Sequence, residues 1–250
     1  MWLKNNTPLV IAHRGDKVHA PENTLAAFEK AASNGADAVE FDVKLSADGS
    51  VIIIHDQTVD RTTNGNGKVK DLTLAELKRL DAGVQFPEKY SGEKIPTLSE
   101  VFDTVGKKLF LNIELTNYAT PWDNLVEKVA HEVKIQKMQD RVFFSSFFPF
   151  NLRKAQKLLP RVPRGLLTWG GWLGWGGRNF GNLNKSYQAM NLFFSDVNPI
   201  MVKRIQAKGK LVIVWTVNSE QDIKKMIEMK VDGIITDDPC LAVQILGRNK

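Results

Sequence analysis

Residues 39–56 read VEFDVKLSADGSVIIIHD, and this stretch decides how the chain folds. Two apolar, β-branched runs flank Asp48-Gly49, a dipeptide that is typical of a tight hairpin turn. The same runs carry four polar side chains, namely Glu40, Asp42, His55 and Asp56. Such a group could be a metal site, an acid/base pair or a salt-bridged core without chemistry, and the rest of the chain has to decide.

The composition is that of a globular protein, with 43% hydrophobic and 25% charged residues among 250. No apolar run approaches the roughly 20 residues of a membrane span, and LVIA at 9–12 is too short for a signal peptide. We therefore expect a cytoplasmic protein without a stable membrane anchor, and the lone Cys240 fits a reducing compartment. The net charge of +6 is spread along the chain, which fits ordinary solubility first and mild steering of an anionic substrate second, and gives little support to nucleic-acid binding.

Short β-branched or aromatic runs alternate with helical patterns along the whole chain. The strand candidates cover 9–14, 38–43, 51–56, 109–115, 141–146, 164–169, 191–196, 211–217 and 232–238. Helical patterns cover 21–35, 122–138, 149–159 and 219–230. Asn23 is the expected cap of the first helix, and two capping boxes start further helices, Thr73 with Glu76 and Thr97 with Glu100.

Nine strands are one too many for an eight-stranded barrel, but the hairpin resolves this. Residues 44–50 are too few for a parallel crossover, so 51–56 should return antiparallel beside the second strand. Eight strands then remain for a parallel (β/α)₈ barrel, whose usual size is about 250 residues. We predict this α/β fold as a single domain over 1–250, with an open doubly wound sheet as the alternative.

The hairpin also predicts which side chains meet. With Asp48 and Gly49 as a two-residue turn, Asp42 and His55 lie directly opposite each other and share one face of the sheet. Glu40 lies two residues before Asp42 and points to the same face. Three polar groups therefore converge, which a core without chemistry does not need.

Ionisable residues end four of the predicted strands, at the barrel end where active sites form. Glu40, Asp42 and Glu114 offer three hard oxygen ligands, which favour Mg²⁺ or Ca²⁺, with Mn²⁺ as a further option. Arg14 carries a guanidinium suited to phosphate, and His13 and His55 can act as acid and base near neutral pH. One divalent metal ion, an arginine and two histidines together suit the cleavage of a phosphodiester.

The order of these motifs resembles the glycerophosphodiester phosphodiesterases of the bacterial cytosolic type. The matching segments are HRGDKVHAPENTLAAF (13–28), VEFDVKLSADGSVIIIHD (39–56), DRTTNGNGKVKDLT (60–73), GEKIPTLSEVF (92–102), NIEL (112–115), SSF (145–147), VWTVN (214–218) and DGIITDDP (232–239). The resemblance implies a (β/α)₈ barrel with a small insertion, placed at 57–108. It also implies metal-dependent hydrolysis of diesters such as glycerophosphocholine or glycerophosphoethanolamine to sn-glycerol 3-phosphate and an alcohol.

Carried over to this chain, the resemblance makes Glu40, Asp42 and Glu114 the metal ligands. His13 and His55 become the base and the acid, or the reverse, while Arg14 contacts the phosphate and Trp215 lies near the substrate. One position departs from the pattern. The resemblance implies a lysine two residues after Glu114, but Thr116 stands there, so a cationic contact is missing or comes from elsewhere.

The segment LLTWGGWLGWGG (166–177) is the part least similar to that family. Its glycine-flanked tryptophans suggest that the 169–180 loop covers the site, with Trp172 contacting an apolar group of the substrate. A transient lipid contact there would make lysophospholipids substrates and the protein a lysophospholipase D. A second alternative is a catalytically silent barrel that binds phosphate esters, for which Thr116 is the support.

Overall fold

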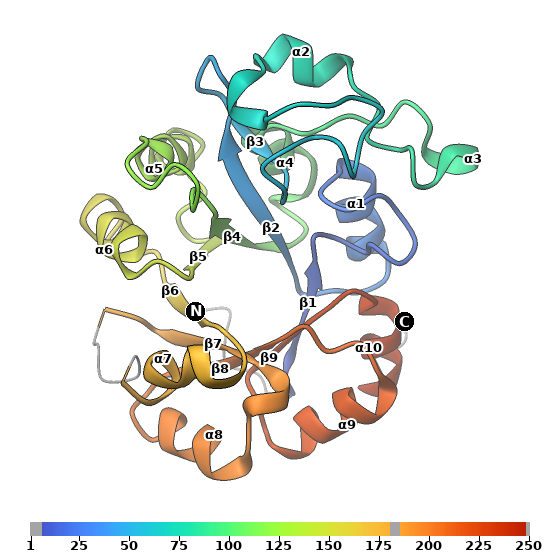
Figure 1. Cartoon of the computed structure of the whole chain (residues 1–250). Coiled ribbons are helices and arrows are strands. Elements are labelled where there is room, and N and C mark those ends of the chain that lie inside the picture. Colours follow the sequence, from blue (N-terminus) through green and yellow to red (C-terminus); the bar gives the residue numbers. More distant parts are fainter. Residues whose placement is uncertain (1–6, 181–185, 249–250) are drawn as a thin grey trace.

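The computed structural model describes residues 7–180 and 186–248, and within them eight parallel strands close into a barrel. The strands are β1 (Leu9–His13), β2 (Ala38–Leu45), β4 (Phe110–Leu115), β5 (Val142–Ser146), β6 (Arg164–Thr168), β7 (Ala189–Phe193), β8 (Leu211–Trp215) and β9 (Gly233–Thr236). Each strand pairs with the next, and β9 pairs with β1 to close the ring. Figure 1 shows the helices outside this ring. The predicted (β/α)₈ barrel is confirmed.

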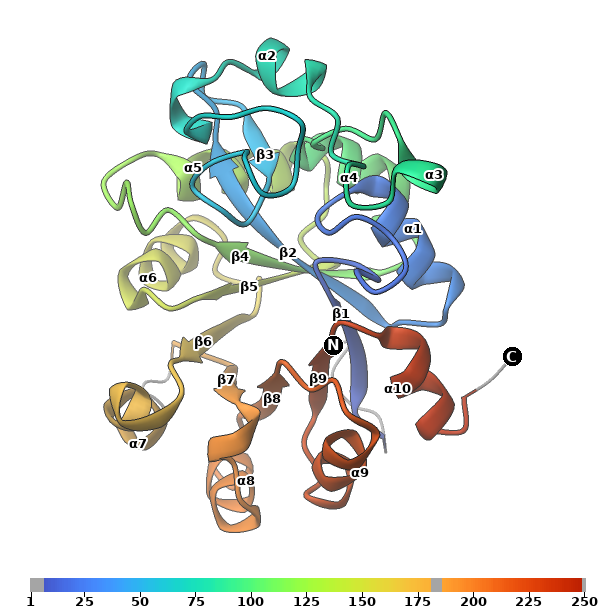
Figure 2. The same cartoon turned by 45° about the vertical axis from the view of Figure 1, so that its right-hand side comes forward.

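The strand β2 is long enough to pair with two different strands along the same edge. Its first part pairs with β1 through Ala38–Glu40, and its last part pairs antiparallel with β3 (Val51–Ile53). Figure 2 shows β2 running past the end of β1 toward β3. The strand β3 therefore lies outside the eight-stranded barrel, beyond the end of β1, as the predicted hairpin requires.

The predicted register of that hairpin was wrong by one residue. Val43 pairs with Ile53, which places Ile54 rather than His55 opposite Asp42. The connection is wider than two residues, because the Ser46 N–H donates to the carbonyl of Ser50 at 3.0 Å. The Ser46 hydroxyl stabilises this wider turn by accepting from the Ser50 N–H and donating to Asp48. His55 consequently reaches the site after the chain has left β3, and not through cross-strand pairing.

Helices follow the strands and pack on the outside of the barrel. They are α1 (Leu25–Ser33), α4 (Leu98–Val105), α5 (Leu125–Ile135), α6 (Pro149–Leu158), α7 (Trp175–Phe180), α8 (Pro199–Gln206), α9 (Glu220–Glu228) and α10 (Pro239–Ile245). Both capping boxes are present at the starts of α2 (Leu74–Arg79) and α4. The expected cap of α1 was wrong, because Thr24 accepts from the Ala27 N–H while Asn23 turns toward Asp42.

The described residues also form three short 3₁₀ segments: η1 (Val69–Asp71), η2 (Gly171–Gly174) and η4 (Phe194–Asp196). The segment expected as a 169–180 loop is helical over η2 and α7. Residues 194–196, expected as the end of a strand, form η4. Within the described ranges, no helix is both long and apolar enough to span a bilayer.

The barrel interior is layered from apolar to charged along the strands. Leu9, Ile11, Ala38 and Ile213 belong to one buried apolar cluster inside the ring. Alternate residues of a strand share a face, so His13 follows Ile11 on β1, and Glu40 and Asp42 follow Ala38 on β2. The charged residues therefore stand at the carboxyl ends of the strands, above an apolar floor.

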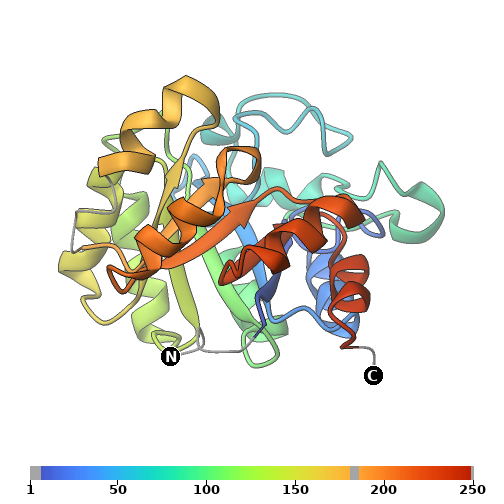
Figure 3. The same cartoon turned by 90° about the horizontal axis from the view of Figure 1, so that it is seen from below.

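The segment between β3 and β4 has an apolar cluster of its own. Its buried members are Ile52, Ile54, Val59, Val69, Leu77, Ala82 and Ile95. It contains η1, α2 and α3 (Pro87–Tyr90), and in Figure 3 its cyan-to-green trace lies to one side of the barrel. The helix α4 instead packs in the main cluster of the barrel wall through Leu98 and Val101. The extent of the insertion, 57–108, stays a prediction.

Candidate active site

A cavity of about 500 Å³ opens where the parallel strands end. Its lining includes His13, Arg14, Glu40, Asp42, Lys44, His55, Asp56, Asn112, Glu114, Thr116, Tyr118, Phe147, Trp169 and Trp215. The structure thus brings together all predicted site residues except Trp172, which does not line this cavity. Trp172 is 84% exposed, and its role in substrate binding stays a prediction.

Three carboxylates form the centre of the site. Asp42 on β2 pairs in register with Glu114 on β4, and Glu40 lies two residues earlier on β2. One oxygen from each carboxylate lies within 4.8 Å of the others. Burial raises the pKa of Glu114 to about 8, helped by the charge of Asp42, and burial with the neighbouring carboxylates raises the pKa of Glu40 well above its usual value.

This donor set fits a divalent metal ion. Three clustered carboxylate oxygens without cysteine are the ligands that Mg²⁺ and Ca²⁺ prefer. Burial and, to a smaller extent, repulsion between the neighbouring carboxylates disfavour the charged forms of Glu40 and Glu114, and a bound cation would compensate these charges. The residues present would therefore hold such an ion at Glu40, Asp42 and Glu114.

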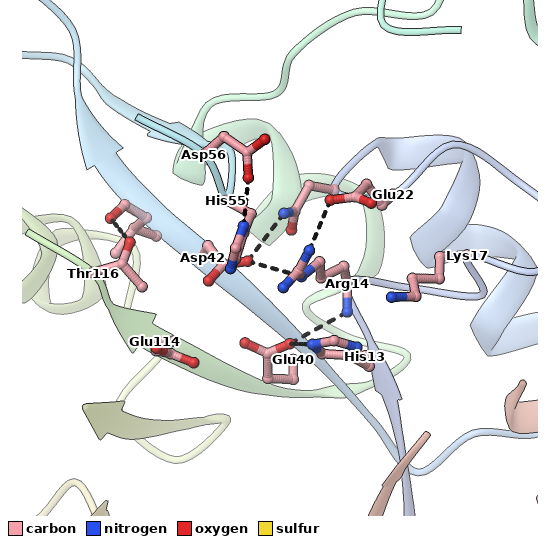
Figure 4. Close-up of polar contacts among 12 residues, drawn as sticks. His13, Arg14, Lys17, Glu22, Glu40, Asp42, His55, Asp56, Glu114 and Thr116 are labelled. Atoms are coloured by element: carbon pink, nitrogen blue, oxygen red, sulfur yellow. Dashed lines mark hydrogen bonds and ion pairs between the residues drawn. The ribbon is translucent and has the colours of Figure 1, made fainter. Parts of the chain in front are cut away.

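Arg14 borders the carboxylates on one side. It adopts a left-handed backbone conformation with φ of 57°, and its N–H donates to the carbonyl of Glu40 at 2.8 Å. The guanidinium Nε lies 3.4 Å from Asp42, and Nη1 donates to Glu22 at 3.0 Å. Figure 4 shows Arg14 between Asp42 and Glu22. The turn after β1 thus aims a fixed cation at the cavity.

His13 is held by a carboxylate from the last strand of the barrel. Its Nδ1 lies 2.6 Å from Asp237 Oδ1, and its Nε2 lies 4.0 Å from Glu40. Burial lowers the pKa of His13, and the hydrogen bond to Asp237 partly counters this effect. Although burial opposes it, the hydrogen bond to His13 helps lower the pKa of Asp237 to about 2. The Nδ1–Asp237 contact leaves Nε2 as the nitrogen for proton transfer.

His55 is held in the same way by its own neighbour in sequence. Its Nδ1 lies 2.6 Å from Asp56 Oδ1, and its side chain is 42% exposed at the mouth of the cavity. Arg61 clamps Asp56 through Nε at 2.7 Å and also donates to Glu22 at 2.8 Å. Arg61 therefore connects Asp56, the partner of His55, to Glu22 in the turn after β1. Figure 4 shows the two ends of this series, the contact of His55 with Asp56 and that of Arg14 with Glu22.

The opposite side of the cavity is aromatic. Phe147 follows β5 and Trp169 follows β6, and their rings stack with centroids 4.1 Å apart. Trp215 at the end of β8 meets Phe147 edge-on, and its indole N–H donates to the carbonyl of Asn191 at 3.2 Å. Tyr118 joins the two sides, because its hydroxyl donates to Glu114 at 2.7 Å.

Sequence reasoning missed several residues of this site, among them the charged residues Asp237, Arg61 and Lys44. Asp237 directly follows β9, so its place at a strand end was a usable signal. Lys44 extends the series Glu40–Asp42 on one face of β2, and the same alternation could have found it. Arg61 lies in an irregular segment, for which no pattern indicates the direction of the side chain.

Comparison with known proteins agrees with this geometry. Residues 13–241 match the model of the Glycerophosphoryl diester phosphodiesterase family. A glycerophosphodiester phosphodiesterase of Caldanaerobacter subterraneus is 45% identical over 96% of this chain and 98% of its own length. One of Bacillus altitudinis is 38% identical over 94% of this chain and 97% of its own length.

A solved structure shares the whole architecture. The phosphodiesterase of Oleispira antarctica, in complex with the product sn-glycerol-3-phosphate, has a TM-score of 0.88 and 34% identity. The match covers 96% of this chain and 97% of that one. With a family match over most of its length and an acidic cavity at the strand ends, this chain belongs to the glycerophosphoryl diester phosphodiesterase family and is an enzyme of that kind.

Proposed function

We propose that the protein hydrolyses glycerophosphodiesters such as glycerophosphocholine and glycerophosphoethanolamine, releasing sn-glycerol 3-phosphate and an alcohol in a metal-dependent reaction. The observation that carries the proposal is the matched pair of histidines. His13 and His55 both line one cavity, and each is held at Nδ1 by a carboxylate 2.6 Å away, which leaves Nε2 for proton transfer. The Oleispira relative binds the product that this reaction would release.

Two histidines transfer protons in the proposed reaction, and the other site residues stabilise charge on the phosphate. His13 acts as the base that removes a proton from a glycerol hydroxyl, which then attacks phosphorus and forms a cyclic phosphate. His55 at the open mouth protonates the leaving alcohol, and the reverse transfers let water open the ring. Arg14 binds phosphate oxygens through its planar fork. A metal ion held by Glu40, Asp42 and Glu114 would supply a positive charge for the phosphoryl oxygens.

The identity of the metal and the location belong to the same proposal. The all-carboxylate ligand set supports Mg²⁺ or Ca²⁺, with Mn²⁺ as a further option. We place the protein in the cytoplasm on the basis of its lone cysteine.

The test is an assay of sn-glycerol 3-phosphate release from both substrates, with enzyme stripped by EDTA and then resupplied with Mg²⁺, Ca²⁺ or Mn²⁺. We expect no release without metal and restored release with at least one of the three ions. His13→Ala and His55→Ala should be inactive, while His131→Ala on the exposed face of α5 should match the wild type. Undiminished turnover in the stripped enzyme contradicts the metal requirement, and absence of release under all conditions supports a silent barrel.

A second activity, as a lysophospholipase D, is favoured by one observation. Large apolar side chains beside the aromatic side of the cavity are exposed, among them Trp172, Leu173 and Trp175 on η2 and α7. Such side chains suit contact with an acyl chain or a lipid surface. Hydrolysis of lysophosphatidylcholine should then fall in Trp172→Ala and Trp175→Ala, while glycerophosphocholine hydrolysis is unchanged. A wild-type enzyme without any lysolipid activity excludes this second function.

A further inference from the structure

Lys44 is a buried lysine in the wall of the active-site cavity. It continues the series of side chains on the inner face of β2, two residues beyond Asp42, and it lines the cavity. Only 5% of its surface is exposed, although lysine is rarely buried unless its charge is compensated. A group that hydrogen-bonds to its ammonium or compensates its charge is therefore expected nearby.

The protein contacts of the ammonium group come from Thr116. Lys44 Nζ donates to the carbonyl and to the hydroxyl oxygen of Thr116, both at 3.1 Å. The hydroxyl of Thr116 in turn donates to the carbonyl of Val43 at 2.8 Å, so its lone pairs face the lysine. Thr116 thus fixes where the ammonium group lies, and it does so with neutral oxygens.

Lys44 and Arg14 differ in whether a nearby carboxylate pairs with their positive charge. Arg14 has carboxylates at 3.0 and 3.4 Å, from Glu22 and Asp42. In the part of the chain that the structure describes, no carboxylate lies within ion-pair distance of Lys44. The charges of Asp42, Glu114 and Asp56 act on Lys44 only from beyond that distance. A buried cation without a directly paired anion is costly, and an anion that enters the cavity would reduce that cost.

The place of Lys44 identifies the kind of anion. Figure 4 shows Thr116, which holds the ammonium, and Arg14 on opposite sides of Asp42. A phosphate group above the carboxylates would therefore meet one cation from each side, in the arrangement that stabilises charge on phosphoryl oxygens. We propose that Lys44 is a catalytic residue that binds the phosphoryl group opposite Arg14, an inference that rests on the proposed function. The cation absent at position 116 is then supplied from the neighbouring strand.

The experiment compares Lys44→Met, Lys44→Arg and the double variant Lys44→Met/Thr116→Lys with the wild type, all at saturating metal. We expect Lys44→Met to lower kcat/KM for glycerophosphocholine by about 30-fold or more, as for the loss of a charged hydrogen bond. Calorimetry should show a similar loss of affinity for sn-glycerol 3-phosphate. Lys44→Arg should retain part of both, and the double variant should recover at least about tenfold over Lys44→Met.

A matched control separates this role from stability. Lys210 precedes β8 at the other end of the barrel, is 7% exposed, and donates to the carbonyl of Tyr187 at 2.6 Å. Lys210→Met should lower the melting temperature as Lys44→Met does but leave kcat/KM and product binding unchanged. If both variants lose activity only in proportion to folded protein, Lys44 is structural and the proposal is wrong.

Two further outcomes are decisive. The Lys44→Met variant could change only the affinity for metal and still bind sn-glycerol 3-phosphate within threefold of the wild type. Lys44 would then only balance the negative charge of the carboxylates, and the proposal that it binds the phosphoryl group would be wrong. If the wild type binds the product but hydrolyses no glycerophosphodiester, the proposed function fails. The ratio of product affinities between variant and wild type then still decides whether Lys44 binds phosphate.

Discussion

The rim of the cavity has two unlike sides. The turn after β1, the end of β2 and the segment after β3 carry Arg14, Asp42 and His55, which are linked to other residues by ion pairs and hydrogen bonds. The loops after β5 and β6 carry Phe147 and Trp169, which are held by ring packing. One side therefore offers fixed charges for a reaction at phosphorus, and the other offers shape and apolar contact. If each side does what its chemistry suggests, substitutions on the charged side change the rate, and substitutions on the aromatic side change the choice of substrate.

The largest effect is expected from Glu114→Gln on the charged side. The change keeps the size of the side chain and the hydrogen bond from Tyr118 but removes one of three clustered charges. We expect kcat/KM for glycerophosphocholine to fall on the order of 1,000-fold at a metal concentration that saturates the wild type. Steady-state kinetics, with circular dichroism as a control for folding, measure this. A loss of less than tenfold would contradict the role of Glu114 as a metal ligand.

A smaller effect is expected from Asp237→Asn, because Asp237 contacts His13 and does not itself line the cavity. The carboxylate helps His13 accept a proton, so we expect kcat to fall on the order of 100-fold. The pKa of His13 is already lowered by burial, and loss of Asp237 lowers it further. Because the base must be neutral, the acid limb of the pH profile of kcat/KM should move to lower pH in the variant. An unmoved acid limb would mean that His13 is not the base.

Metal binding should depend on pH through the carboxylate cluster. Burial raises the pKa of Glu114 to about 8, so at pH 6 the metal-free cluster holds a proton that a metal ion must displace. Since the folded pKa lies above the unfolded one, this group contributes stability at low pH that is lost as the pH rises through about 8. Calorimetry should show metal affinity rising by up to about tenfold per pH unit between pH 6 and 8. The increase in Tm on adding Mg²⁺ or Ca²⁺ should be larger at pH 8.5 than at pH 6, whereas equal increases would contradict the raised pKa.

The smallest effect on the reaction with glycerophosphocholine is expected on the aromatic side. Trp169→Ala removes a ring that stacks on Phe147 but holds no charged group. We expect kcat/KM to fall less than tenfold, mainly through KM, with kcat nearly unchanged. Trp122→Ala is the matched control, since Trp122 is exposed and stacks on Phe150. A loss of kcat in Trp169→Ala as large as that in Asp237→Asn would abolish the distinction between the two sides.

Much of the barrel could be predicted because its strands obey simple local rules. Each predicted strand overlaps a real one. Because residues 44–50 are too few for a parallel crossover, the position of β3 outside the ring was predictable as well. The helices α8 and α10 were missed, although both start with a local signal. Asn198 and Asp238 cap them, and Pro199 and Pro239 occupy their first positions.

The site was predictable where it depends on alternation along a strand and not where it depends on turns. Glu40, Asp42 and Glu114 meet because β2 and β4 pair in register, which follows from the pattern of the strands. The register of the hairpin depended on a hydrogen bond from Ser50 to the Ser46 hydroxyl, which no residue pattern specifies. The reach of Arg61 to Asp56 and Glu22 depends likewise on how an irregular segment folds over the barrel.

His55 is attached to a part of the structure outside the barrel wall, and this affects how the enzyme would lose activity on heating. His55 follows Ile54, which belongs to the separate apolar cluster formed by β3 and the segment between β3 and β4, and not to the cluster of the barrel wall. Parts of a protein that have their own small core can open locally at a lower free energy than the whole molecule. Detachment of that segment would withdraw one proton carrier while the carboxylates and the barrel stay intact. Thermal inactivation should then precede global unfolding, and it should reverse on cooling.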